Sequence, residues 1–335
     1  MVRKATLPHA LLIRGGEGIG KLDFVRKLAQ SLACDSPTAN GTACGECQSC
    51  RWFAAGSHPD YRELRPEAVR SVEADDGADA ANDELADEAI GRRRRKPSEE
   101  IKIEEVRALR DFIHLSAHRS GGKTIVICPA EALNPNAANA LLKNLEEPPA
   151  GTRFILISHR PYRLPATIIS RCQQIALAPP TAAIAEQWLR EQGAAEPALS
   201  LAQTGNAPLA ALQLAADEYW AQRKMVLGAL SKRHFNALEL AEAVRDYPLP
   251  RLLGWLQRWS YDLLLAKSTG RVRYNPDYEA ALAQTAAALD ALKLARYHRL
   301  LVGWQRIVHH PLNPRLFAEQ LLLSYALLSR NEEVA

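Results

Sequence analysis

Residues 9–21 read HALLIRGGEGIGK and contain the clearest indication of the fold. A short apolar run, His9–Ile13, leads into a turn rich in glycine, and a helical pattern follows from Lys21 to Ala33. A buried strand, a glycine-rich turn and the start of a helix form the arrangement that holds phosphate in P-loop proteins. The candidate nucleotide-binding residues are the glycines and the lysine of this turn: Gly15, Gly18, Gly20 and Lys21.

The same turn lacks the groups that would hold Mg²⁺. A P-loop needs Ser or Thr directly after its lysine, and this chain has Leu22 there. It also needs an acidic residue at the end of a neighbouring strand, where this chain has Cys128 and Pro129, with Glu131 further on. We therefore expect no ATP hydrolysis and no catalytic residue acting within this chain. Weak binding of ATP, ADP or another anion is left open.

Strand-like runs alternate with helical patterns through the first half of the chain. After His9–Ile13 the runs are Thr124–Cys128, Phe154–Ser158 and Gln174–Leu177. Asn134-Pro135 is predicted to begin a helix, because Asn suits the N-cap and Pro the first helical position; two prolines end that helix at Glu147. This alternation is typical of a parallel α/β sheet.

Beyond Pro179-Pro180 the pattern is helical to the end of the chain. One predicted helix has a single apolar face made of Leu252, Leu256, Trp259 and Leu263. Another begins at Asn313-Pro314 and contains Leu316, Phe317, Leu321 and Leu323. Core packing is the simpler explanation of these residues and of Trp220, Trp255 and Trp304, and a subunit interface is the alternative.

Four of the six cysteines lie close together in the sequence. Their spacing is C-x9-C-x2-C-x2-C, and tetrahedral Zn²⁺ needs four such thiolates. Disulfides and a redox C-x-x-C site are weaker alternatives, because nothing indicates an oxidising compartment and a fourth cysteine exceeds what a redox pair needs. The predicted ligands of a structural zinc ion are Cys34, Cys44, Cys47 and Cys50. Cys128 and Cys172 are expected to pack at strand ends.

Length and composition limit the remaining possibilities. A chain of 335 residues suggests two or three domains, and 47% hydrophobic with 6% aromatic residues favours helices. The longest apolar runs are far shorter than the roughly 20 residues of a membrane span. Residues 1–12 do not resemble a signal peptide, so a cytoplasmic protein without membrane contact is predicted.

The net charge of +4 is unevenly distributed. Nine acidic residues between Glu67 and Lys96 are followed by the basic block Arg92–Lys96, in a stretch with almost no apolar residues. Residues 67–98 are therefore predicted to be a disordered insertion in a loop. A solvated spacer is the simpler interpretation, and a phosphate-contacting tail is the alternative.

Several motifs resemble those of the clamp-loader AAA+ family of bacterial DNA polymerase III. The segment Asn139–Pro149 reads NALLKNLEEPP and is similar to that family's signature. Ser170-Arg171-Cys172 resembles the motif that offers an arginine finger, here Arg171, to the ATP site of a neighbouring subunit. The segments His58–Tyr61 and Asn313–Leu316 are also similar to clamp-loader sequences.

The resemblance implies a fold of three domains. These are an AAA+ P-loop-like α/β domain over residues 1–178 with a zinc module inserted at 34–50, a small helical lid domain over 179–217, and an all-α collar for oligomerisation over 218–335.

The resemblance also implies a function. The family's ATPase subunits, γ and τ, have both Mg²⁺-anchoring groups, and this chain lacks them; it also has Pro208 where those subunits have a sensing arginine. The implied protein is a non-hydrolysing part of the DNA polymerase III holoenzyme. It would form a hetero-pentamer with γ/τ and δ subunits that loads the sliding clamp onto primer-template DNA with ATP.

Two other functions are weighed against this one. An active ATPase of the γ/τ type is disfavoured by Leu22, Cys128 and Pro129. A zinc-dependent DNA-binding regulator with a vestigial P-loop would explain the cysteines and Arg92–Lys96. It leaves Ser170–Cys172 and the helical second half unexplained.

Overall fold

The computed structural model describes residues 7–70, 97–119, 121–214, 217–232, 235–308, 310, 313–330 and 332. The chain divides into two compact units, Met1–Pro179 and Pro180–Ala335. The predicted insertion at 67–98 lies for the most part outside the described residues, as does the basic block Arg92–Lys96.

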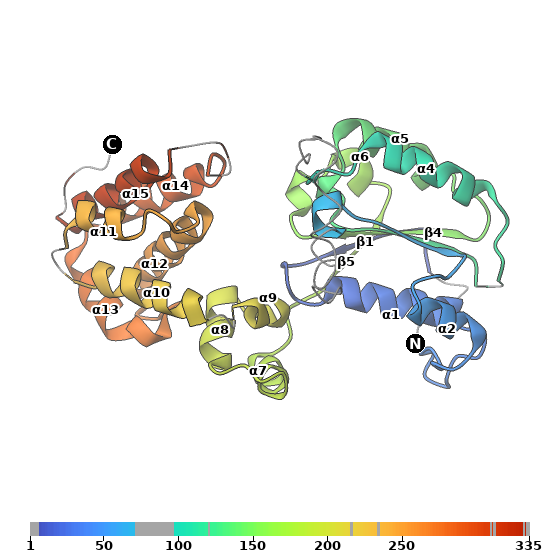
Figure 1. Ribbon diagram of the computed structural model, residues 1–335, viewed down its shortest axis with the longest axis horizontal. Coiled ribbons are helices and arrows are strands. Elements are labelled where there is room, and N and C mark those ends of the chain that lie inside the picture. Colours follow the sequence, from blue (N-terminus) through green and yellow to red (C-terminus); the bar gives the residue numbers. More distant parts are fainter. Residues whose placement is uncertain are drawn as a thin grey trace, which may run out of the picture. The chain divides into compact units, whose positions relative to one another are not determined.

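The first unit contains a sheet of five parallel strands (Figure 1). The strands, in the spatial order β2-β3-β4-β1-β5, are β2 (Tyr61–Leu64), β3 (Lys123–Ile127), β4 (Thr152–Ser158), β1 (Ala10–Arg14) and β5 (Gln173–Ala176). The interior strand β1 pairs with β4, where Leu12 is opposite Leu156, and with β5, where Leu12 is opposite Gln174. The predicted parallel sheet is confirmed.

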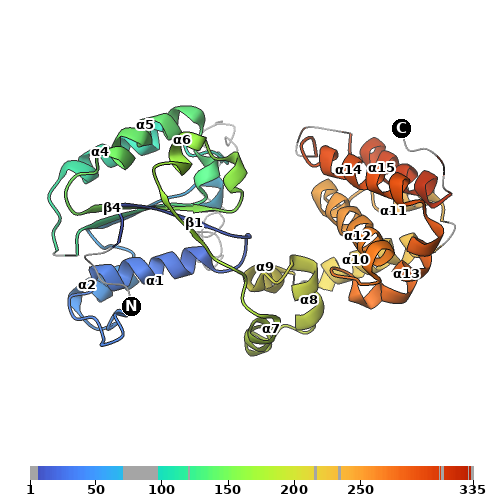
Figure 2. The same ribbon diagram turned by 180° about the vertical axis from the view of Figure 1, so that it is seen from behind.

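Helices cover both faces of this sheet, as Figures 1 and 2 show. On one face lie α1 (Lys21–Ala33) and α2 (Gln48–Ala54); on the other lie α4 (Ile103–His114), α5 (Pro135–Glu146) and α6 (Ala166–Ile169). Two short 3₁₀ helices, η1 (Ala130–Ala132) and η2 (Pro161–Arg163), follow β3 and β4. The Asn134 side chain caps α5 by accepting a hydrogen bond from the Ala137 amide at 2.8 Å, as predicted.

The edge strand β2 was not among the predicted strands. It is only four residues long and reads YREL, so it has neither an apolar run nor a clear alternation. Its Glu63 accepts hydrogen bonds from Arg26 of α1, at 3.0 Å from Nε and 2.8 Å from Nη2. A charged residue is accommodated at this edge because a partner on the covering helix neutralises it.

The second unit is helical throughout its described residues, as predicted. Its helices are α7 (Ala182–Glu191), α8 (Pro197–Thr204), α9 (Pro208–Gln213), α10 (Asp217–Leu230), α11 (Ala237–Ala243), α12 (Leu249–Thr269), η3 (Pro276–Tyr278), α13 (Glu279–Ala288), α14 (Ala291–Trp304) and α15 (Pro314–Ser329). Helices α7–α9 enclose a small core around Leu189 and Leu201. A larger core gathers around α12. None of the described helices is long and apolar enough to cross a membrane.

The predicted apolar face of α12 is fully buried, with Leu252, Leu256, Trp259 and Leu263 all at 0% exposure. Trp259 donates a hydrogen bond to the Tyr325 hydroxyl at 2.8 Å, which satisfies its indole N–H in the core. The prediction of core packing is wrong for two residues of α15. Leu316 is 60% exposed and Leu323 is 41% exposed, because both lie on the opposite side of the helix from the buried Phe317 and Leu321.

A buried polar junction connects α8, α10 and α12. The Asn275 side-chain oxygen accepts hydrogen bonds from Gln203 at 3.0 Å and from Arg223 at 2.9 Å. Its amide nitrogen donates to Asp262 at 2.8 Å, and Asp262 also accepts from the backbone amides of 273–275. These bonds satisfy polar groups that would be costly to bury alone, so they fix the loop before η3 against the surrounding helices.

Candidate functional site

The glycine-rich turn has the shape of a P-loop. Gly20 caps the start of α1 with a φ of +86°, a left-handed conformation that favours glycine. Gly15 lies so close to the residue after β5 that a Cβ atom there would lie 2.5 Å from the Leu177 carbonyl oxygen. Glycine is therefore required at both positions by the fold itself, whether or not phosphate binds.

The Lys21 side chain is directed back onto this turn. It is almost fully buried, and its Nζ donates to the Gly15 carbonyl oxygen at 2.9 Å and to the carbonyl oxygen of Gly16. Burial lowers the pKa of Lys21, and the nearby carboxylates of Glu131 and Glu17 oppose that shift. The ammonium group that would bind phosphate in a P-loop thus donates its hydrogen bonds to two carbonyl oxygens of its own loop.

Neither position that should hold Mg²⁺ offers an oxygen ligand. Leu22 packs against the apolar cluster between β1 and α1. Cys128, at the end of β3, is also buried in that cluster, and burial raises the pKa of its thiol to about 12, so the sulfur is protonated at neutral pH. The described residues therefore give this turn no carboxylate or hydroxyl at the expected metal positions.

The nearby Glu131 is hydrogen-bonded through one of its two carboxylate oxygens, and the other, Oε2, is buried without a hydrogen-bond partner among the described residues. Its Oε1 accepts hydrogen bonds from the backbone amides of His159 and Arg160, both at 2.9 Å, so the carboxylate is fixed against the chain that follows β4. Burial, together with the positive charge of Lys21, lowers the pKa of His159, and its imidazole is neutral at pH 7. A single buried ammonium with two carboxylates around it attracts phosphate less than an intact P-loop would.

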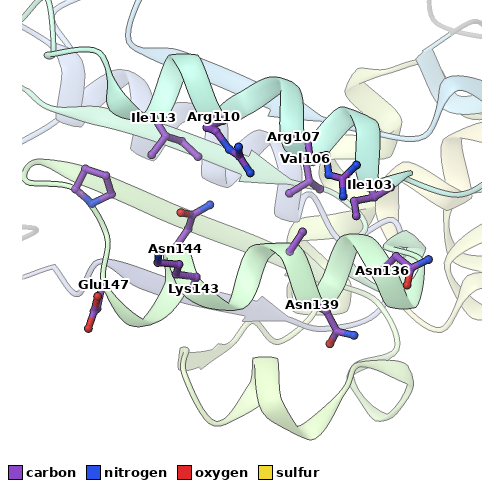
Figure 3. A pocket seen from close by; sticks show the side chains of 12 residues that line it. Ile103, Val106, Arg107, Arg110, Ile113, Asn136, Asn139, Lys143, Asn144 and Glu147 are labelled. Atoms are coloured by element: carbon purple, nitrogen blue, oxygen red, sulfur yellow. The ribbon is translucent and has the colours of Figure 1, made fainter.

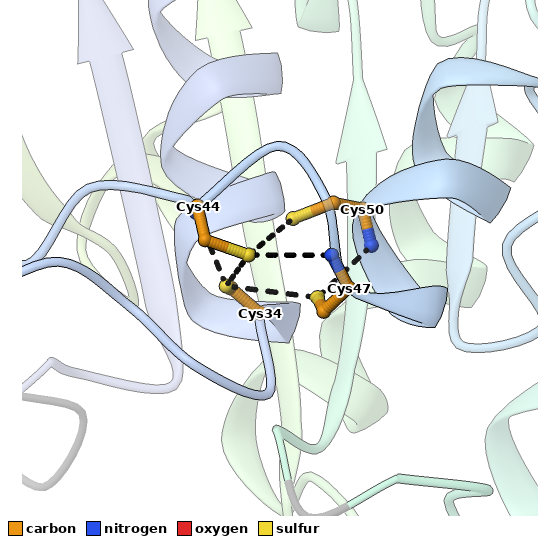
Figure 4. A group of neighbouring side chains, drawn as sticks. All are labelled: Cys34, Cys44, Cys47 and Cys50. Carbon is orange, nitrogen blue, oxygen red and sulfur yellow. Dashed lines mark hydrogen bonds between the residues drawn. The ribbon is translucent and has the colours of Figure 1, made fainter.

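The four clustered cysteines converge on one point, as Figure 4 shows. All four sulfur atoms lie within 4.8 Å of one another, and three of the pairs are 3.6 Å (Cys34–Cys44), 3.8 Å (Cys34–Cys47) and 4.0 Å (Cys44–Cys50) apart. A tetrahedral ion with Zn–S bonds of about 2.3 Å needs sulfurs about 3.8 Å apart. None of the four cysteines forms a disulfide, and their spacing could hold a metal ion.

The backbone favours the thiolate form of Cys47. Burial raises the pKa of that thiol, but hydrogen bonds from backbone amides, first that of Cys50, lower it to about 6. The Cys50 amide lies 3.4 Å from the Cys47 sulfur, and the Cys47 amide lies 3.4 Å from the Cys44 sulfur. Amide-to-sulfur bonds of this kind stabilise negative charge on metal-bound thiolates.

The segment His58–Tyr61 has a structural role beside the cysteines. Ser49 of α2 donates to the Ala33 carbonyl oxygen at 2.7 Å, and its hydroxyl lies 2.8 Å from His58 Nε2. Asp60 accepts hydrogen bonds from the backbone amides of His118 and Arg119, both at 2.9 Å. These buried contacts join the cysteine segment to the edge of the sheet.

Arg171 lies in the turn between α6 and β5. Its Nε and Nη2 both bond to Glu146 at the end of α5, and its Nη1 donates to the Thr167 carbonyl oxygen at 2.9 Å. The side chain is 32% exposed. The neighbouring Cys172 is buried, and burial raises the pKa of its thiol to about 11, so its role in the described structure is packing, as predicted.

A groove between α4 and α5 was not predicted from the sequence (Figure 3). Its volume is about 740 Å³, and the cations that line it are Arg107 and Arg110 of α4 and Lys143 of α5. Three asparagines also line it, and Glu147 is the one acidic residue among the described lining residues: Asn136, Asn139, Asn144 and Glu147. The sequence signal was the spacing of Arg107 and Arg110, which places two cations on one helix face.

Comparison with known proteins gives consistent matches over both units. The family model "DNA polymerase III, delta subunit" matches residues 1–181, and the model "DNA polymerase III, delta subunit, C terminal" matches residues 217–326. A DNA polymerase III subunit delta′ from Pseudomonas aeruginosa is 40% identical over 78% of this chain and 73% of its own length. The subunit delta′ of Yersinia pestis is 33% identical over 94% of this chain and 88% of its own length.

A further match covers half of the chain. The DNA polymerase III subunit tau of Salmonella typhimurium is 33% identical over 50% of this chain and 21% of its own length.

Proposed function

Because this chain belongs to the family of DNA polymerase III δ′ subunits, we propose that it is a clamp-loader subunit that does not hydrolyse ATP. In this proposal it supplies Arg171 to the ATP site of a neighbouring ATPase subunit. The observation that carries the proposal is a half-buried arginine on a surface turn of a domain whose own P-loop lacks both Mg²⁺-anchoring groups.

The chemistry of the site supports the proposed absence of hydrolysis. Phosphoryl transfer needs Mg²⁺ to neutralise charge on the phosphates and a group that orients the nucleophile. Leu22 and Cys128 are packed in an apolar cluster, and Glu131 is bonded to the chain after β4. These contacts support the loss of Mg²⁺ binding and of water activation together.

The role of Arg171 in a neighbouring site rests on charge. The transition state of phosphoryl transfer spreads negative charge over the oxygens of the transferred group, and a guanidinium that reaches them can raise the rate by about 10³–10⁵. Arg171 has five N–H donors and stands on a turn whose flanking residues Ile168 and Cys172 are buried. A turn anchored in this way can present the arginine side chain to a neighbouring subunit.

We propose zinc as the ion held by Cys34, Cys44, Cys47 and Cys50. Four thiolates with sulfur distances near 3.8 Å suit its tetrahedral geometry, and no ligand position is left open for a substrate. The role is therefore structural, since it fixes the chain between α1 and α2.

The proposed partners are γ/τ and δ subunits in a hetero-pentamer, with the clamp and primer-template DNA bound through the complex. The similarity to a tau subunit supports the association with γ/τ. The cationic groove between α4 and α5 supports contact with DNA phosphates, because arginine, lysine and asparagine are the residues that bind them.

We also propose the division of the second part of the chain into a lid over 179–217 and a collar over 218–335. The separate small core of α7–α9 supports it. A cytoplasmic location remains a prediction.

The experiment that tests the proposed function is clamp loading by a complex reconstituted with γ/τ and δ subunits, with and without this chain. ATP-dependent loading should require the chain. Loading at the same rate without it would contradict the proposal.

A further inference from the structure

The contacts of Arg171 distinguish it from an ordinary exposed arginine. Its Nε and Nη2 bond to the same carboxylate oxygen, Oε1 of Glu146, and its Nη1 donates to the Thr167 carbonyl oxygen at 2.9 Å. A longer contact of 3.4 Å joins Nη1 to the Ser170 hydroxyl. Arginine has five N–H donors, and these contacts use at most four of them. All three guanidinium nitrogens are therefore held, while one N–H donor, on Nη2, is left for another acceptor.

Both partners of this ion pair stand on one rigid base. Glu146 is the last residue of α5, directly after Leu145, and Arg171 follows α6, whose Ile168 is buried in the same cluster as Leu145. The Leu145 carbonyl oxygen lies 3.0 Å from His9 Nε2, which fixes the end of α5 to the start of β1. The backbone position of Glu146 is thus set by the core of the first unit.

We propose that Glu146 is the positioning residue of the arginine finger. Its Oε1 atom holds the long Arg171 side chain in one orientation, so that the remaining donor meets the phosphate of the neighbouring subunit without a search through rotamers. The inference rests on the proposed function of Arg171. An exposed ion pair contributes little to stability, so this contact matters for orientation rather than for folding.

A competing role makes the opposite prediction. If the negative charge of Glu146 held Arg171 away from the phosphate, removal of that charge would raise the rate. The structure offers a way to separate the two roles, because both bonds end on a single oxygen. A glutamine at this position keeps an amide oxygen that can accept both bonds and lacks the charge.

The experiment uses the full complex with γ/τ and δ subunits, the clamp and primer-template DNA, and measures stimulated ATP hydrolysis and clamp loading. Glu146→Ala should lower clamp loading, and turnover at the one ATP site that borders this subunit, by about three- to tenfold, since a misplaced catalytic group costs this much or more. Total hydrolysis should fall only in part. Glu146→Gln should stay within about twofold of wild type, as its amide oxygen keeps the geometry. This rescue would not be expected of a group that acts through its charge alone.

Two further variants keep the result interpretable. Glu186→Ala removes the carboxylate of another exposed ion pair, with Arg190 at 2.9 Å in α7, and should leave both rates unchanged. Glu146→Ala combined with Arg171→Ala should be no slower than Arg171→Ala alone.

The outcomes separate the two proposals. If Arg171→Ala lowers the rates and Glu146→Ala does not, the role of Glu146 is overturned, while the proposed role of Arg171 is supported. If Arg171→Ala changes neither ATP hydrolysis nor clamp loading, Arg171 is not an arginine finger, and the proposed role of Glu146 is overturned as well. A rise in rate with both Glu146→Ala and Glu146→Gln would show that Glu146 restrains the finger, which also overturns the positioning role.

Discussion

Lys21 is the lysine expected of a P-loop, but its side chain makes different contacts from those of a phosphate-binding lysine. In an intact P-loop the lysine meets the phosphates of a bound nucleotide. Here its ammonium group bonds to the carbonyl oxygens of Gly15 and Gly16, in the interior of the first unit. The retained lysine is therefore a weaker indication of nucleotide binding than the sequence suggested.

The isolated chain should show no ATP turnover, and Leu22→Thr should not restore it. A threonine hydroxyl would supply one Mg²⁺ ligand, but Cys128 is a protonated thiol and Glu131 is bonded to two backbone amides. Phosphate release over time, with and without DNA, is the measurement. Steady release that disappears in Lys21→Ala would show that the site is an active one.

At the scale of elements, the cysteine segment between α1 and α2 behaves as a small module with its own cross-links. Ser49 and His58 tie it to the sheet, and the cysteine sulfurs lie at distances suited to one tetrahedral ion. Few apolar residues in this segment are buried, so the ion would replace a hydrophobic core.

The purified chain should contain one zinc ion, and Cys47→Ser should lose it. A serine hydroxyl is a poor substitute for a thiolate, and the three remaining thiolates leave the tetrahedron incomplete. Metal analysis by mass spectrometry, together with thermal unfolding, is the measurement. Cys172→Ala is the matched control, because that buried cysteine lies outside the cluster and should keep the ion. A metal-free wild type with unchanged folding would contradict the prediction.

Helices and strands with a clear hydrophobic pattern could be predicted from the sequence. Features that depend on contacts between residues far apart in the chain could not. Three of the four predicted strands are short apolar runs bounded by turns, and helix α12 has a clear apolar face; local sequence contains both signals. Strand β2 was missed because its short polar sequence is stabilised by β3 and Arg26. The groove and the Glu146–Arg171 pair were also missed, since their residues are far apart in the chain.

At the scale of the whole molecule, several large apolar side chains of the second unit are exposed rather than buried in its core. Leu316 and Leu323 of α15 are 60% and 41% exposed, and Leu292 and Val302 of α14 are 60% and 48% exposed. Exposed apolar residues that gather on neighbouring helices often mark a protein interface. This surface is where we expect the collar to contact the other subunits.

Leu316→Glu combined with Leu323→Glu should therefore weaken assembly without unfolding the chain. Both side chains are exposed, so the free energy of unfolding should change by no more than about 1 kcal/mol for the pair. Size-exclusion chromatography with γ/τ and δ subunits measures assembly, and thermal unfolding measures stability. Ile184→Glu, at a residue of α7 that is 63% exposed, is the control. Assembly at wild-type affinity would place the interface elsewhere.

The central claim is that this subunit lacks catalysis of its own and contributes Arg171 to a neighbouring ATP site. The most direct test is clamp loading and stimulated ATP hydrolysis by the complete complex with Arg171→Ala, beside Arg190→Ala as an exposed-arginine control. ATP turnover at the one site of the complex that Arg171 would reach should fall by about 10³-fold or more. Total hydrolysis should then fall in part and clamp loading severely, with assembly and zinc content intact. Clamp loading and hydrolysis at wild-type rates in the Arg171→Ala complex would contradict the claim.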